Sequence, residues 1–236
     1  MSGKQTSQFI TENEARRALI ETCLRMNALS INQGKSGNVS LRWDRGLEDG
    51  LLITPSGLPY ERLQIDDIVW ISMRLLGSGD AATPACRDDA REPSSEWRMH
   101  RDVYAHRNEA QAVVHTHGAF AASLSCSARV QREGIGPFHY MVAIAGGADI
   151  RCAPYASFGT QALSDHALRA LQDRQGCLLA NHGLLALGGS LEQALAMAAE
   201  VETLARMYWQ VLQLGDPVML DAVEMRAVAE RLSPRR

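Results

Sequence analysis

The sequence predicts an α/β fold in which a mixed or antiparallel sheet carries helices on both faces. Two observations predict it: apolar residues recur at helical spacing in several separate segments, and stretches with a period of two lie between them, some joined directly by short turns. Strands joined by short turns pair antiparallel, and interleaved helices need a sheet face to cover. Because no repeat, low-complexity segment or internal boundary interrupts the sequence, we expect one domain over residues 1–236.

The N-terminal third combines one helix with three strands. Thr11 and Glu14 form a capping box, and apolar residues at helical spacing extend the helix as far as Gly34. Three segments then have the pattern of strands: residues 39–43, 51–54 and 68–73. Residues 77–91 are polar and of mixed charge, so we expect an exposed loop there.

The rest of the chain interleaves helices and strands. A helix begins near Ser94-Ser95-Glu96, and Ser190 with Gln193 forms a second capping box that opens a long helix over residues 190–211. Between them we expect, in order, a strand at 112–117, helices at 119–125 and 140–145, a strand at 150–153, a helix at 160–174 and strands at 177–180 and 184–187. Asn181-His182-Gly183 joins the last two strands, which puts a histidine at a hairpin turn.

The composition narrows the classes of function. Lys and Arg number 24 against 27 Asp and Glu, a formal net charge of −3, which argues against a nucleic-acid-binding protein or one that lies on an anionic membrane. The first residues lack a secretory apolar core and no stretch reaches the roughly 18 apolar residues of a membrane span, so we expect a cytoplasmic protein. The five cysteines form no Cys-x-x-Cys pair, and we expect buried thiols.

Three of the seven histidines are candidate metal ligands. His115 and His117 point to the same side of an extended strand, because side chains alternate along it, and two imidazoles so placed can share one ion. The same spacing also arises by chance. His182 is a third candidate, although a histidine at a hairpin turn more often serves only the turn.

Glu96 is the best candidate for the carboxylate that metal-assisted proton transfer needs. It stands in the first turn of a helix, where a negative side chain also simply stabilises the helix dipole. Ser94 and Ser95 precede it, and two hydroxyls beside unpaired backbone N–H groups can hold a phosphate. Because such serines are also common helix caps, both interpretations stay open.

Two glycine-bearing turns are candidates for the rest of an anion site. They are Ser36-Gly37-Asn38 and Thr54-Pro55-Ser56-Gly57, whose small side chains allow backbone amides to approach a ligand. Turns of this kind mostly just reverse the chain.

Among the other histidines, His100 lies one helical turn after Glu96 and is a rival ligand, but Tyr104 and His106 in the next turn indicate a partly exposed helix face. His139 and His166 have no supporting neighbours.

Seven short motifs occur in order along the chain. They are Gly37-Asn38-Val39-Ser40, Ile53-Thr54-Pro55-Ser56-Gly57, Pro93-Ser94-Ser95-Glu96-Trp97, Val113-Val114-His115-Thr116-His117, Phe138-His139-Tyr140-Met141, Cys152-Ala153-Pro154-Tyr155-Ala156-Ser157-Phe158-Gly159-Thr160 and Asn181-His182-Gly183. Together they are far more specific than any one alone, and the chain resembles the class II aldolase and adducin-head family. The resemblance covers about residues 10–215 and leaves 216–236 as a C-terminal tail.

The resemblance implies an α/β/α sandwich around a central, mainly antiparallel sheet, assembled as a homotetramer with active sites between subunits. It also implies a zinc-dependent aldolase that reversibly cleaves a ketose 1-phosphate, such as L-fuculose 1-phosphate, to dihydroxyacetone phosphate and an aldehyde. The ligands of one Zn²⁺ per subunit would be His115, His117 and His182, with Glu96 beside the metal as catalytic acid/base. Tyr140 matches a tyrosine that the neighbouring subunit presents to protonate the aldehyde oxygen. The substrate phosphate would be held by Gly37, Asn38, Ser56, Gly57, Ser94 and Ser95.

Two departures from this pattern concern the aldehyde half of the substrate. The chain has no tyrosine after Tyr208, whereas the fuculose-phosphate enzymes carry one in the C-terminal tail, and residues 77–91 look longer than the family's loop. Aldolases of 5-deoxyribulose or 5-methylthioribulose 1-phosphate are therefore the main alternative. An L-ribulose-5-phosphate 4-epimerase is less favoured because epimerases of the family carry aspartate where Glu96 stands. A non-catalytic adducin-like head is also less favoured, since it has no need of a complete ligand set.

Overall fold

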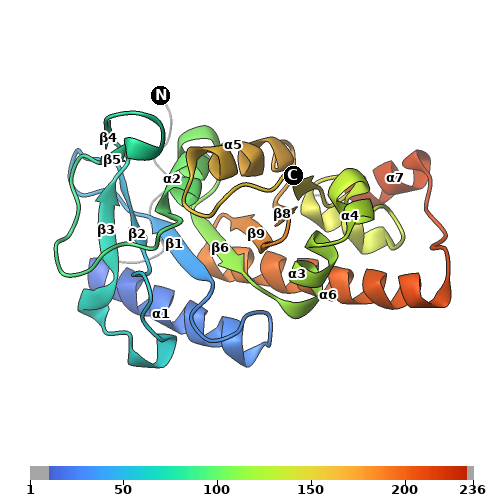
Figure 1. The fold of residues 1–236 in the computed structure, drawn as a ribbon, viewed down its shortest axis with the longest axis horizontal. Helices are drawn as coiled ribbons and strands as arrows, with labels where there is room; N and C mark the ends of the chain where they lie inside the picture. Colours follow the sequence, from blue (N-terminus) through green and yellow to red (C-terminus); the bar gives the residue numbers. More distant parts are fainter. Residues whose placement is uncertain (1–10, 233–236) are drawn as a thin grey trace.

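The computed structural model describes residues 11–232 and centres on a seven-stranded sheet in the order β3-β2-β1-β6-β9-β8-β7 (Figure 1). The strands are β1 (Asn38–Arg42), β2 (Gly50–Ile53), β3 (Val69–Ser72), β6 (Ala112–Thr116), β7 (Cys152–Ala153), β8 (Gly176–Leu179) and β9 (Gly183–Gly188). Every neighbouring pair is antiparallel except β7 and β8, which are parallel. The predicted, mainly antiparallel sheet is therefore confirmed.

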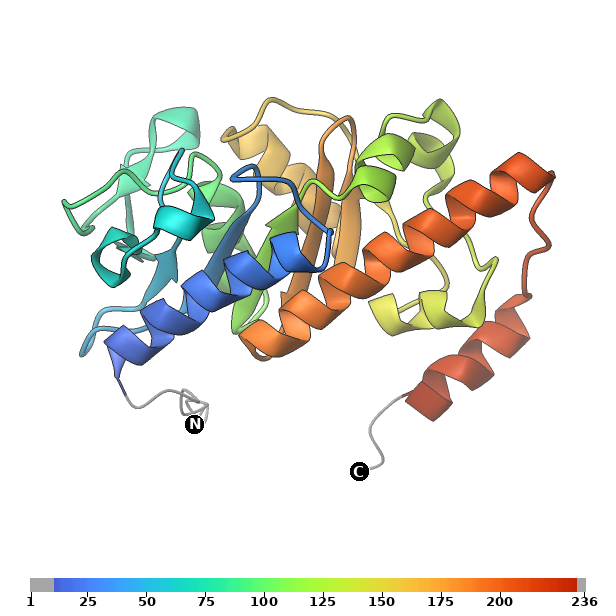
Figure 2. The ribbon, with the colours of Figure 1, turned by 90° about the horizontal axis from the view of Figure 1, so that it is seen from below.

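Helices cover both faces of the sheet and make three layers. α1 (Glu12–Ala28) and α6 (Leu191–Leu214) lie on one face, seen in front of the strands in Figure 2, and α2 (Trp97–His106) and α5 (Gln161–Ala170) lie on the other. Side chains of β6 alternate between the two: Val114 packs in the core with α1 and α6, and Val113 packs in the core with α2 and α5. Because His115 follows with the parity of Val113, it faces the α2 layer.

Most of the predicted elements form, but two predicted helices end early. The capping box of Thr11 and Glu14 opens α1, yet the helix ends at Ala28 rather than at Gly34. Ser30 adopts a φ of +58°, in the left-handed region, which an α-helix cannot continue through. The helix predicted to reach residue 174 likewise ends at Ala170, ahead of Asp173 with a φ of +56°.

The sequence predicts an exposed loop over residues 77–91, but the structure contains short regular elements there. β4 (Leu75–Leu76) and β5 (Thr83–Pro84) form a separate two-stranded sheet, with a short 3-10 helix, η3 (Gly79–Ala81), between them. Two further 3-10 helices, η1 (Tyr60–Arg62) and η2 (Ile65–Asp67), precede β3. The segment is mostly exposed, but Asp88 turns inward and accepts a hydrogen bond from the Trp70 backbone N–H.

The second half contains two helices beyond those predicted from the sequence. The predicted helices α3 (Ala119–Ser125) and η4 (Tyr140–Ala145) are both present. α4 (Ala128–Glu133) and α7 (Ala222–Leu232) were not predicted. α4 is short and has few apolar residues, whereas most residues of α7 are apolar and its buried Met225 and Val228 stand at helical spacing. α7 packs back onto η4 and buries Met225 and Val228.

The structure bears on two predictions made from composition, one on the cysteines and one on membrane spans. All five cysteines are free, as expected, but not all are buried: Cys23 and Cys177 are buried, whereas Cys86 and Cys126 are exposed. Within residues 11–232, no helix combines the length and apolarity needed to cross a membrane.

Candidate metal centre

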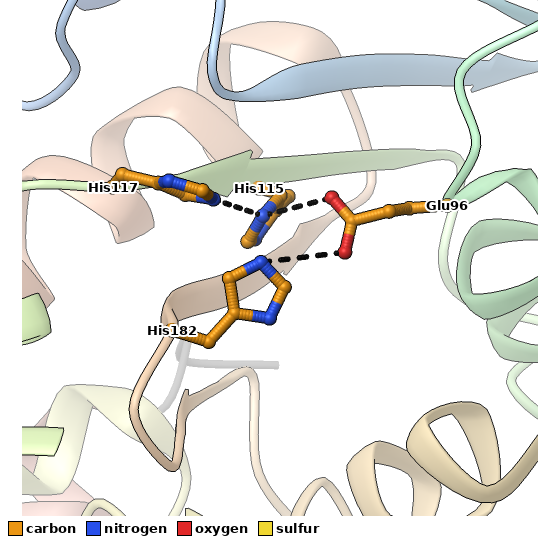
Figure 3. A group of neighbouring side chains, drawn as sticks. All are labelled: Glu96, His115, His117 and His182. Atoms are coloured by element: carbon orange, nitrogen blue, oxygen red, sulfur yellow. Dashed lines mark hydrogen bonds and ion pairs between the residues drawn. The ribbon is translucent and has the colours of Figure 1, made fainter. Parts of the chain in front are cut away.

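Four side chains converge at the ends of β6, β8 and α2, and we call them the histidine cluster: Glu96, His115, His117 and His182 (Figure 3). One donor atom from each lies within 4.8 Å of the others. The His115 Nε2 atom is 2.9 Å from His117 Nε2 and 3.1 Å from Glu96 Oε2, and His182 Nε2 is 3.4 Å from Glu96 Oε1. The structure thus brings together all four residues predicted as metal ligands.

The backbone around the cluster is held tightly. His115 pairs with Asn38 of β1 and with Leu185 of β9, so its position is fixed from both sides. Asn181 adopts a φ of +54° and makes the tight turn that presents His182. A Cβ on Gly183 would lie 2.3 Å from the Thr116 carbonyl oxygen, so only glycine lets this turn approach the end of β6.

Hydrogen bonds from other segments hold the three histidines in place. The His115 Nδ1–H group donates to the Leu184 carbonyl at 2.8 Å, which leaves the Nε2 lone pair facing the cluster. The backbone N–H of His117 donates to the Asn32 Oδ1 atom, and that of His182 donates to the Ser125 hydroxyl. Hydrogen bonds from β9, the turn after α1 and α3 therefore fix the ring of His115 and the backbones of His117 and His182.

Glu96 occupies the N-cap position of α2, but it does not cap the helix. Its side chain makes no capping hydrogen bond and instead faces the histidines. The Oε2 atom accepts a hydrogen bond from the Asn38 amide at 2.9 Å, whereas the buried Oε1 atom has no hydrogen-bond partner. The structure thus disfavours a purely helix-stabilising role for this carboxylate.

Burial and neighbouring charges shift the pKa values of the cluster. Burial raises the pKa of Glu96, but the charges of His115 and His182 and its hydrogen bonds outweigh this and hold that pKa well below its usual range. Burial, together with the charge of His115, lowers the pKa of His117 to about 3 and that of His182 to about 4. Burial also lowers the pKa of His115, but the Glu96 carboxylate outweighs it and raises this pKa. At neutral pH the cluster offers a carboxylate and two neutral imidazoles.

These features fit a divalent cation. Imidazole nitrogens and a carboxylate are the usual ligands of catalytic zinc and related ions. The Nε2 atoms of His115 and His117 lie in hydrogen-bond contact, and two nitrogen lone pairs so close need a proton or a cation between them. The unpartnered Oε1 of Glu96 points to the same centre. A cation would satisfy all of these atoms at once.

The residues predicted to hold a phosphate lie on three adjoining segments. The turn after β2 meets the segment before α2, where the Ser94 N–H donates to the Thr54 carbonyl and the Ser56 N–H donates to the Glu92 carbonyl. Gly57 has a φ of +72°, and Ser56, Gly57 and Ser95 are exposed. Gly37 and Asn38 are buried beside β6, where a Cβ on Gly37 would lie 2.4 Å from the His115 carbonyl oxygen.

Tyr140 lies outside the histidine cluster. It is half exposed on η4, where its ring contacts that of His139, and η4 packs against α6 and α7. His100 was predicted on a partly exposed face, and this is wrong: both His100 and Tyr104 are buried against β1. His106 of the same helix is exposed.

Several residues around the site were not predicted. Asn32, Lys35 and Ser125 follow no spacing that marks a site, and each acts through the backbone of another segment. Lys35 donates from its Nζ atom to the Gly57 carbonyl at 2.8 Å and brings a positive charge to the predicted phosphate turn. The Ser36-Gly37 turn signal next to it was the available clue.

Comparisons with known proteins identify the family of the chain. The family described as "Class II Aldolase and Adducin N-terminal domain" matches residues 17–209. A 5-methylthioribulose-1-phosphate/5-deoxyribulose-1-phosphate aldolase of Rhodospirillum rubrum is 46% identical over 92% of this chain and 90% of its own. An L-fuculose phosphate aldolase of Escherichia coli is 44% identical over 93% of this chain and 94% of its own.

The fold comparison points the same way. The solved structure of an L-fuculose 1-phosphate aldolase superposes with a TM-score of 0.79 at 33% identity, covering 98% of this chain and 99% of that one. The family match spans β1 through most of α6 and includes every residue of the histidine cluster. The chain therefore belongs to the class II aldolase and adducin family, and it is an aldolase, a lyase of the metal-dependent class.

Proposed function

We propose that this protein is a zinc-dependent aldolase that reversibly cleaves a ketose 1-phosphate to dihydroxyacetone phosphate and an aldehyde. The observation that carries the proposal is the histidine cluster, in which three imidazoles and the free oxygen of a buried carboxylate face one point. The family membership and the activities for which the relatives are named support the same reaction.

His115, His117 and His182 would hold the zinc ion, with Glu96 beside it. The bound cation would stabilise the negative charge that breaking the C3–C4 bond leaves on the dihydroxyacetone phosphate half. Neutral imidazoles leave the cation its full charge. In synthesis the Glu96 carboxylate would remove a proton from C3 of dihydroxyacetone phosphate. In cleavage Glu96, protonated from solvent, would return that proton to C3 after the bond breaks.

Tyr140 would transfer the second proton. In synthesis the Tyr140 hydroxyl would give its proton to the aldehyde oxygen, and in cleavage the Tyr140 phenolate would take that proton from the C4 hydroxyl. Exchange of one proton between Glu96 and Tyr140 through solvent would then restore both groups. Tyr140 is half exposed on η4, so its hydroxyl would be available to the site of a neighbouring subunit. We therefore propose a homotetramer with active sites between subunits.

The phosphate would bind where the turn after β2 meets the start of α2. The site would be formed by the six predicted residues: Gly37, Asn38, Ser56, Gly57, Ser94 and Ser95. The Ser56 and Ser94 N–H groups already donate to backbone carbonyls, so these two residues would offer their hydroxyls. Lys35 would add a positive charge, because its ammonium group already lies on the Gly57 carbonyl. Binding the phosphate away from the breaking bond would position the substrate for cleavage.

L-Fuculose 1-phosphate is the first candidate substrate, and one observation favours a second. The chain has no tyrosine after Tyr208, and its C-terminal helix α7 packs on η4. A different C-terminal segment beside Tyr140 would change the wall that meets the aldehyde half. 5-Methylthioribulose or 5-deoxyribulose 1-phosphate, named for the Rhodospirillum rubrum relative, is therefore the second candidate.

A substrate panel tests the proposal. The purified protein loaded with Zn²⁺ is given L-fuculose, 5-methylthioribulose and 5-deoxyribulose 1-phosphates, and dihydroxyacetone phosphate release is followed with a coupled enzyme. L-Ribulose 5-phosphate, with its phosphate at the other end, is the matched control. We expect cleavage of at least one ketose 1-phosphate. Epimerisation of the control, or no cleavage of any 1-phosphate, would contradict the proposed reaction.

A further inference from the structure

Behind the histidine cluster, polar side chains of β1 and α2 interlock. Asn38 and Ser40 stand two residues apart on β1, whereas Glu96, His100 and Tyr104 follow at four-residue intervals from the start of α2. Two residues of a strand span about 6.6 Å and four residues of a helix about 6 Å, so the two rows stay in step. The five side chains therefore alternate between strand and helix in one row.

Hydrogen bonds connect the whole row. The Asn38 Nδ2 atom lies 2.9 Å from Glu96 Oε2, and the His100 Nε2 atom lies 2.5 Å from Asn38 Oδ1. Ser40 Oγ is 2.7 Å from both His100 Nδ1 and the Tyr104 hydroxyl. None of the five side chains belongs to a residue more than 4% exposed, so water does not compete for these bonds.

The chemistry of Glu96 fixes the direction of every bond. A carboxylate only accepts, so the Asn38 amide must turn its N–H groups toward Glu96 and its oxygen toward His100. His100 must then carry its proton on Nε2, which leaves Nδ1 to accept from the Ser40 hydroxyl. The Tyr104 hydroxyl donates in turn to Ser40. All donors point toward the carboxylate.

We propose that His100 is a positioning residue of the aldolase, which holds the Asn38 amide so that Glu96 Oε2 is engaged and Oε1 stays free for the reacting centre. This role rests on the proposed function. Without a donor at His100, the buried Asn38 oxygen has no partner and the amide is held only by its bond to Glu96, so it can tilt and weaken its hold on Oε2. Burial lowers the pKa of His100 to about 3, so the ring keeps a single proton at working pH.

Two substitutions of His100 separate positioning from packing. A glutamine at this position would place an amide donor near the former Nε2 atom, whereas a leucine fills space without a donor. We expect His100→Leu to lower kcat by about 10- to 100-fold with metal content unchanged, and His100→Gln to recover most of that loss. Equal kcat values for the two variants would overturn the proposal. Val103→Ala, a buried apolar change on the same helix, controls for loss of stability alone.

A double-mutant cycle tests whether His100 acts through Asn38. In an Asn38→Ala background, His100→Leu should lower kcat by no more than about twofold, because the group it orients is already gone. A further loss as large as that in the wild-type background would show that His100 acts by another route and would contradict the proposal.

The tautomer of His100 can be measured without substrate or activity. In long-range ¹⁵N–¹H spectra of the metal-free protein, we expect a neutral ring with a protonated Nε2 and a bare Nδ1 between pH 5 and 8, assigned by its loss in His100→Gln. A proton on Nδ1 would overturn the proposal even if the enzyme is active. Wild-type protein that cleaves no ketose 1-phosphate would instead overturn the proposed function, and the tautomer would still report whether the row of hydrogen bonds exists.

Discussion

Two groups of charged side chains in this fold differ in whether their charged atoms are all paired within the group. Between α1 and the segment before α2, Arg16 and Arg45 each contact both Glu12 and Asp88 with N–O distances of 2.6 or 2.7 Å. In the histidine cluster, by contrast, the buried Glu96 Oε1 has no hydrogen-bond partner and two imidazole nitrogens face each other.

The comparison separates a structural charge group from a functional one. The first group has two positive and two negative side chains in a ring, so its charges are balanced within the chain. In the histidine cluster, most of the acceptor atoms face one common point, where only a ligand can satisfy them. We therefore expect changes in the first group to alter stability and changes in the second to alter metal binding and activity.

The largest effect should follow removal of a ligand. His115→Ala should lose bound metal and lower aldolase activity by about three orders of magnitude or more, because one of the ligating nitrogens is gone. Metal analysis and the coupled assay measure both. His106→Ala, an exposed histidine on α2, is the matched control and should keep both properties. If His115→Ala kept its metal and its activity, the cluster could not be the active site.

Removing the proton-transfer group should be nearly as costly. Glu96→Gln keeps the shape and the hydrogen bond from Asn38 but cannot exchange a proton, so kcat should fall by about 10²- to 10⁴-fold. The thermal midpoint and circular dichroism spectrum should stay near those of the wild type. Full activity in a folded, metal-loaded variant would remove Glu96 from the reaction.

Acid should weaken metal binding through His115. Glu96 raises the pKa of His115, so this ring is the first of the three to bind a proton as the pH falls, and a bound proton must leave before the ring can ligate. We expect the affinity of the metal-free protein for Zn²⁺ to fall by about tenfold per pH unit below the pKa of His115 and to level off above it. Calorimetric titration at several pH values measures this, and a pH-independent affinity would contradict the account.

The smallest effect is expected in the closed ring. Burial raises the pKa of Asp88, but Arg45, Arg16 and the Trp70 N–H outweigh it and lower the pKa to about 2. This depressed pKa contributes stability above about pH 4 that is lost as the pH falls toward 2, so Asp88→Asn should lower the free energy of unfolding at pH 7 by about 2 kcal/mol.

Urea denaturation checks this prediction. The difference between Asp88→Asn and the wild type should shrink as the pH drops from 4 to 2, and activity per folded molecule should not change. Asp89→Asn, at the exposed neighbouring position, should leave the unfolding free energy within about 0.5 kcal/mol of the wild type. A large loss of activity in Asp88→Asn would show that the two groups are not separate.

The sequence predicted the layers of the fold because periodicity reports burial directly. The strands that build the sheet, the capping box of α1 and the N-cap Ser190 of α6 are where the pattern placed them. The second capping box forms only in part, because the Gln193 side chain accepts from the Gly189 N–H and not from that of Ser190. The ends of the helices were harder to predict from the sequence. The left-handed φ of Ser30, for example, depends on the turn that follows and not on the Ser30 side chain. α7, in contrast, was predictable, because Met225 and Val228 stand three residues apart in an apolar segment and are the side chains that it buries.

The residues of the histidine cluster could be predicted from the sequence, but the residues that hold them in place could not. His115 and His117 share one short motif, and His182 lies at a turn with a marked sequence. The role of His100 depends on how α2 is aligned against β1, and these two elements are far apart in the chain. The residues next to His100 in the sequence do not indicate this contact. A four-residue interval on the helix matched to a two-residue interval on the strand is the signal that could have revealed it.

Metal removal and return in one sample tests the central claim most directly. The protein is stripped with a chelator, assayed with the ketose 1-phosphate that the substrate panel identifies, and reloaded with Zn²⁺ while metal content is measured. We predict less than about 1% of the activity without metal and recovery in proportion to binding, complete at about one ion per chain. Full activity in the stripped protein, or metal binding that His115→Ala leaves unchanged, would contradict the assignment of the histidine cluster as the catalytic metal centre.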